Sequence, residues 1–110
     1  MTENISPFKA LDFIRDNAEE LGRLKGQMVY MQEKRKTVKA MLMASCSEKT
    51  ESAKETYAYS HPDYVRHLEE LREAIAEFET LRVKVVAAEA KIEVWRSLEA
   101  SGRMEMRSTQ

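Results

Sequence analysis

The sequence predicts an all-α protein, built as a long antiparallel helical hairpin of the coiled-coil kind. Three observations favour this fold. Apolar residues recur at steps of three and four along two long stretches, which is the period of one helix face. The 110 residues include only three glycines and two prolines. Charged residues make up 34% of the chain, a proportion typical of long, solvated helices rather than of a sandwich or barrel.

The first helix is expected over residues 7–44, after a tail at residues 1–6. Ser6 can cap it, and a proline follows in the first turn, where no backbone donor is needed. Gly22 and Gly26 lie within this run, and each lowers the stability of the helix by about 1 kcal/mol relative to alanine. Because the period continues through both, we expect a close approach to a neighbour or a mild bend rather than a break. The apolar face is Phe8, Leu11, Ile14, Ala18, Leu21, Leu24, Met28, Met31, Val38 and Leu42.

A polar stretch at residues 45–59 is expected to be the connector between the helices. Its Cys46 is the single cysteine, so no intrachain disulfide can form, and a reducing compartment such as the cytoplasm is the simpler interpretation. No histidine lies near Cys46 to act as the base that nucleophilic catalysis needs. The chain also lacks an apolar run near the roughly 20 residues that span a bilayer, so no membrane association is expected.

The second helix is expected over residues 60–101. Ser60 followed by Asp63 resembles a capping box, and Pro62 suits the first turn. A glycine is expected to end the helix before a tail at residues 102–110. The apolar face of this helix is Leu68, Leu71, Ile75, Phe78, Leu81, Val85, Ala88, Ile92, Trp95 and Leu98.

The two apolar faces can be laid against each other in antiparallel order. In such a pair, the numbers of facing residues have a near-constant sum, and a sum of about 110 sets apolar against apolar throughout. The expected pairs are Leu11 with Leu98, Met31 with Phe78, Val38 with Leu71, and Leu42 with Leu68.

Further apolar residues lie off these faces. We expect a second copy to cover them, which makes a homodimer and a four-helix bundle; a higher oligomer or a partner protein would cover them equally well. These off-face residues are Phe13, Val29, Met41, Met43, Val65, Val83, Val86 and Val94. Trp95 and the methionines fit a bundle core, or alternatively a binding surface. The candidate partner or oligomer interface is Met28, Met31, Met41, Phe78, Val85, Ile92 and Trp95.

The net charge is −1, which indicates neither a nucleic-acid nor a membrane partner. A basic cluster could contact nucleic acid, but the only aromatic residue close by for base stacking is Tyr30. Pairing with acidic residues of the second helix, or simple exposure to solvent, is therefore favoured. This cluster is Lys34, Arg35, Lys36 and Lys39. An acidic face could mimic the charge of DNA, and it consists of Glu69, Glu70, Glu73 and Glu77.

No motif indicates an enzyme, a cofactor or a metal site. Glycine-rich phosphate loops, zinc-ligand spacing and nucleophile elbows are missing from the sequence. The acidic face could help to hold a pair of metal ions in a helical bundle only if two helices also carried Glu-x-x-His motifs. The sequence contains no such motif. We expect His61 near the cap of the second helix and His67 exposed or half-exposed on it. No catalytic residue is therefore assigned.

The second half of the chain contains the stretch SHPDYVRHLEELREAIAE, followed by LRVKVVAAEAKIEVWRSLEASGR. This half resembles small helical accessory proteins of tailed phages and prophages. The similarity lies in Tyr64, Leu81-Arg82, Ala87-Ala88 and residues 92–97. Such proteins are encoded near early recombination or replication genes. The resemblance implies a non-enzymatic protein of the host cytoplasm that contacts a phage or host protein, first of all the recombination or replication machinery. An inhibitor of a host defence system or nuclease is the alternative, and direct DNA binding through the basic cluster is third.

Overall fold

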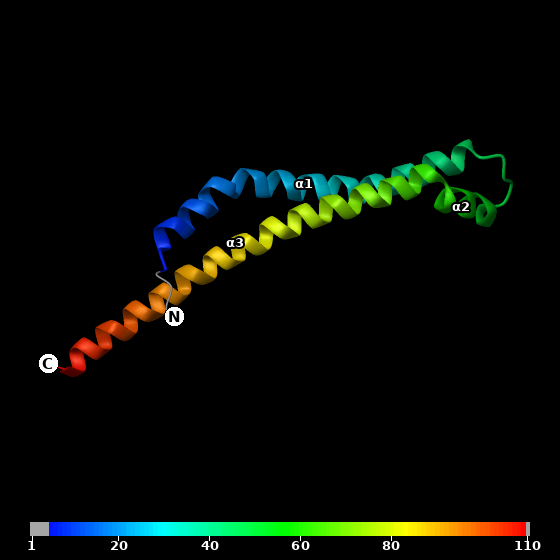
Figure 1. The fold of residues 1–110 in the computed structure, drawn as a ribbon. Coiled ribbons are helices and arrows are strands. Elements are labelled where there is room, and N and C mark those ends of the chain that lie inside the picture. Colours follow the sequence, from blue (N-terminus) through cyan, green and yellow to red (C-terminus); the bar gives the residue numbers. More distant parts are fainter. Residues whose placement is uncertain (1–4, 110) are drawn as a thin grey trace. The chain divides into compact units, whose positions relative to one another are not determined.

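A computed structural model describes residues 5–109, and this part of the chain consists of three helices and contains no strand. Helix α1 spans Pro7–Ser45, α2 spans Glu51–Ser60 and α3 spans Pro62–Thr109 (Figure 1). The predicted all-α class is confirmed. Contacts divide the chain into two units, which we call the terminal unit, Met1–Leu21 with Thr80–Gln110, and the central unit, Gly22–Glu79.

In the central unit, α1 and α3 run side by side in opposite directions, with α2 folded back beside their ends (Figure 1). Met31 of α1 packs with Leu71 and Ala74 of α3 in one buried cluster. A second cluster joins Leu42, Ala58 and Tyr64, one residue from each helix. The core of this unit is therefore a narrow seam between helices.

The predicted pairing of α1 with α3 is wrong in this unit. Met31 packs with Leu71 rather than with Phe78, and Leu42 packs with Tyr64 rather than with Leu68. Leu71 and Ala74 precede Phe78 by seven and four residues, and Tyr64 precedes Leu68 by four, so α3 is displaced by one to two helical turns from the predicted alignment. An apolar face that repeats at steps of three and four meets its partner about equally well after such a displacement. The period of the sequence therefore could not choose between the two alignments.

Helix α2 occupies most of the stretch that was expected to be a polar connector. Thr50 caps it, because its hydroxyl accepts a hydrogen bond from the backbone N–H of Ala53 at 3.1 Å. Ala58 is fully buried, and its small side chain lets α2 pack closely against Leu42 and Tyr64. A helix that buries a single alanine has no apolar stripe, which is why the three-and-four pattern did not reveal it.

In the terminal unit, α1 begins as its sequence predicts. The Ser6 hydroxyl accepts a hydrogen bond from the backbone N–H of Lys9 at 3.3 Å, and Pro7 occupies the first turn. Ala10 of α1 and Val85 and Ala88 of α3 are buried. These small or β-branched side chains make a thin core for this unit.

Two of the roles predicted for the glycines, a helix stop and a close approach to a neighbour, are wrong. Gly102 lies inside α3 without the left-handed backbone of a helix stop, so residues 102–109 are helical where a tail was expected. A β-carbon placed on Gly22 or Gly26 would meet no atom within 4 Å. The expected close approach at these two glycines is therefore also wrong, and both lie exposed on α1.

Candidate functional site

The predicted interface residues do not form one open surface. Met31, Phe78 and Val85 are buried within the chain, and Met28, Ile92 and Trp95 are half-buried. Met41 is the exception, with 67% of its surface exposed. Most of this set therefore stabilises the hairpin itself and leaves little surface for another protein.

A different apolar surface is open in the terminal unit, on α3. Val83, Val86 and Val94 are 54%, 48% and 48% exposed, and Ala90 between them is exposed too. At 3.6 residues per turn, these four residues lie on the opposite side of α3 from buried Val85 and Ala88. We call Val83, Val86, Ala90 and Val94 the outer face. Its three valines were among the off-stripe residues that the sequence singled out, but they were not chosen as interface residues.

The basic cluster of the central unit is partly engaged in contacts of its own. Lys36 pairs with Glu33 at 3.5 Å, and Lys34 lies 6.0 Å from the centroid of the Tyr30 ring. Arg35 is exposed. The expected pairing with acidic residues of α3 is not what these contacts show, because Lys36 pairs within α1.

Lys39 joins α1 to α2. Its ammonium lies 3.5 Å from a carboxylate oxygen of Glu55 and 4.7 Å from the centroid of the Tyr59 ring. A hydrogen bond with Tyr59 raises the pKa of Lys39. Partial desolvation lowers this pKa, but the negative charge of Glu55 also raises it, so the net direction is upward. Lys39 thus helps to hold α2 in place, which makes it a poor phosphate ligand.

The acidic face is exposed at all four of its glutamates. Glu70, Glu73 and Glu77 line a groove of about 450 Å³ together with Arg23 and Gln27 of α1. Glu69 does not line this groove. The row of carboxylates therefore faces solvent beside an arginine, and three of the four glutamates share one side of α3.

The residues that could carry acid, base or nucleophile chemistry make structural contacts. His67 is only 4% exposed, contrary to expectation, and its Nε2–H donates a hydrogen bond to the Met31 carbonyl at 2.7 Å. Nδ1 of His61 accepts a hydrogen bond from the Asp63 N–H at 3.0 Å, in the first turn of α3. Cys46 Sγ donates to the Met43 carbonyl at 3.2 Å. These three side chains are spread over separate local contacts rather than gathered at one site.

Within residues 5–109, no three potential ligands among histidine, cysteine, aspartate and glutamate come together as a metal site. In the same range, no helix has a stretch long and apolar enough to cross a membrane. Comparisons of the sequence with protein-family models, with curated proteins and with solved structures find no match.

Proposed function

We propose that this chain is a non-enzymatic protein that acts through protein–protein contact. The outer face of α3 is the observation that carries this proposal, because it exposes three valines on a helix that already buries its opposite side. Apolar stripes on both sides of one helix are typical of a helix with two neighbours. The resemblance of α3 to accessory proteins of tailed phages and prophages supports a role beside recombination or replication machinery.

A second copy is the first choice to cover the outer face, which would make a four-helix bundle from two hairpins. Full burial of a valine contributes about 1.5–3 kcal/mol, so half-exposed valines supply about 1 kcal/mol each. Six such valines in a dimer offset only the lower end of an association cost of about 4–15 kcal/mol. We therefore expect Ala90 and neighbouring residues such as Leu98, which is 60% exposed, to take part and the dimer to dissociate at micromolar concentrations.

Sedimentation equilibrium with matched variants tests self-association through the outer face. Val86→Glu should convert the dimer to monomer, because the carboxylate would be buried between the two copies. Val29→Glu is the control, since Val29 is 44% exposed but lies in the central unit. A monomeric wild-type chain at 100 micromolar, or equal weakening by both variants, would rule out this interface.

The accessory role is tested by affinity capture of the tagged chain from phage-infected cells after nuclease treatment. The proposal is supported if a phage recombination or replication protein is recovered with the wild-type chain. This protein should no longer be recovered with Val86→Glu or with a variant of another surface. Recovery of a host nuclease or defence subunit would favour an inhibitor instead. The exposed row of Glu70, Glu73 and Glu77 is the observation that keeps this second candidate. Recovery of no protein would count against both.

A further inference from the structure

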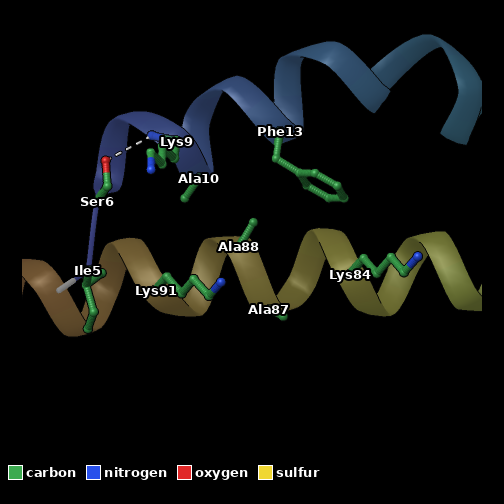
Figure 2. A pocket seen from close by; sticks show the side chains of 9 residues that line it. All are labelled: Ile5, Ser6, Lys9, Ala10, Phe13, Lys84, Ala87, Ala88 and Lys91. Atoms are coloured by element: carbon green, nitrogen blue, oxygen red, sulfur yellow. Dashed lines mark hydrogen bonds between the residues drawn. The ribbon is translucent and has the colours of Figure 1, made fainter. Parts of the chain in front are cut away.

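The terminal unit contains a groove of about 550 Å³ between α1 and α3 (Figure 2). Ala10 and Ala88 point toward each other across the two helices, and the Phe13 ring points from α1 toward α3. Ala10 and Ala88 are 5% and 6% exposed, while Phe13 is half-buried. Two alanines at the contact leave no long side chain to fill the space beside them, so the groove has an apolar floor.

Three lysines border this floor and no carboxylate does. Lys84 and Lys91 stand two turns apart along one side of α3, and Lys9 comes from the first turn of α1 (Figure 2). Within residues 5–109, none of the three ammonium groups forms an ion pair; Asp12 and Glu93, which lie near Lys9 and Lys91 in the sequence, pair with arginines instead. The groove thus combines an apolar base with three ammonium groups that form no ion pair among the described residues.

We propose that this groove binds an acidic amphipathic helix of a partner protein. Lys84 and Lys91 lie about 10.5 Å apart along the axis of α3, so carboxylates spaced by seven residues on a partner helix would face both. Apolar side chains on the same side of that helix would rest on Ala10, Phe13 and Ala88. This is the mode of recognition in which an amphipathic helix lies in a groove between helices. The inference rests on the proposed function and adds the chemistry of the partner.

Other anions fit this groove less well. A nucleic-acid backbone would meet the three ammonium groups but would leave the ring of Phe13 and the alanine floor without a partner. A fatty acid would match both features, yet a groove between only two helices cannot enclose most of a small ligand, as small-molecule sites do. An acidic helix satisfies the charge and the apolar floor and needs no third wall.

Binding of a labelled peptide to the full chain tests the inference. The probe is a helical peptide with leucines on one side and glutamates spaced by seven residues at its border, and a second peptide carries lysines in place of the glutamates. Fluorescence anisotropy should show saturable binding of the acidic peptide only. Lys84→Glu combined with Lys91→Glu should weaken binding by about tenfold or more, because attraction becomes repulsion. Lys25→Glu combined with Lys49→Glu makes the same change in net charge on exposed residues outside the groove and should leave affinity within about twofold.

Three results would overturn the inference: no binding of the acidic peptide, equal binding of both peptides, or equal loss in both double variants. Duplex DNA and oleate-containing vesicles serve as further probes. If Lys84→Glu with Lys91→Glu abolished binding of DNA or vesicles while the acidic peptide failed to bind, the groove would belong to that anion instead. Circular dichroism should show unchanged helicity in both double variants. A dimer that forms through the outer face but ignores the acidic peptide would refute this inference alone and leave the proposed function standing.

Discussion

Replacing His67 by alanine is expected to destabilise the central unit by about 2–3 kcal/mol. The first contribution is the hydrogen bond from Nε2–H to the Met31 carbonyl at 2.7 Å, which is worth about 1 kcal/mol net. The second is the loss of a ring that is only 4% exposed, which leaves a cavity beside Met31 and adds about 1–2 kcal/mol. A chain of this size has about 5–15 kcal/mol of stability in total, so the effect is large.

His67→Leu separates the two contributions. Leucine fills most of the space of the ring, so no large cavity forms. The Met31 carbonyl keeps its hydrogen bond within α1, so it is not left without a partner. The cost should therefore be at most about 1 kcal/mol, well below that of alanine. His67→Gln, which retains a donor but not the ring, should lie between the other two.

Urea unfolding followed by circular dichroism at 222 nm measures these differences, with all proteins at one concentration because self-association would add stability. Unfolding of the central unit alone would show as a separate transition. If His67→Ala changed stability by less than about 0.5 kcal/mol, or if His67→Leu were as damaging as His67→Ala, the reasoning from burial and hydrogen bonding would be refuted.

Three further predictions rest on local structure. Gly22→Ala with Gly26→Ala should stabilise the chain by about 1–2 kcal/mol, because both glycines lie in open space inside α1; an unchanged urea midpoint would contradict this. Thr50→Ala should cost about 1 kcal/mol through loss of the α2 cap, whereas Thr50→Ser should cost much less in the same assay. Lys39 has a raised pKa, so its favourable contribution is fully present below its ordinary pKa of 10.5 and is lost as pH rises through the higher folded value. Stability from this residue should therefore stay constant from neutral pH to about pH 10 and fall above it, and Lys39→Arg should reduce that fall because arginine does not titrate there.

The elements that the sequence could predict are those set by local chemistry. The spacing of apolar residues predicts long helices, and Ser6 with Pro7 predicts where α1 begins, because each signal acts within one turn. Gly102 misled the prediction because a glycine inside a helix costs only about 1 kcal/mol, which the turns on both sides outweigh. Helix α2 was missed because it depends on one cap and one buried alanine rather than on a repeating face.

The candidate surfaces depend on tertiary alignment, and so they were less predictable. The sequence marked the valines of the outer face as surplus to the hairpin but could not rank them above Met31 or Phe78. His67 looked like a surface residue because it lies off the predicted apolar face, which begins at Leu68. The lysine-bordered groove brings residues near 10 together with residues near 88, whereas the predicted pairing sets residues near 10 opposite residues near 100.

The heptad repeat of the α1–α3 seam also has a consequence for how the central unit folds. A hairpin closed one heptad out of alignment still sets Met31 against an apolar residue, Phe78, but it loses the bond between His67 and the Met31 carbonyl and the packing of Leu42 with Ala58 and Tyr64. We expect such a state to compete with the native hairpin during folding, and natural sequences keep competitors of this kind rare through specific contacts. Refolding measured by stopped-flow should then show two phases, a fast one for direct folding and a slower one for escape from the misaligned hairpin. A single phase would contradict this expectation. The native pairing is then favoured over the displaced one by the buried His67 imidazole together with the contacts of α2.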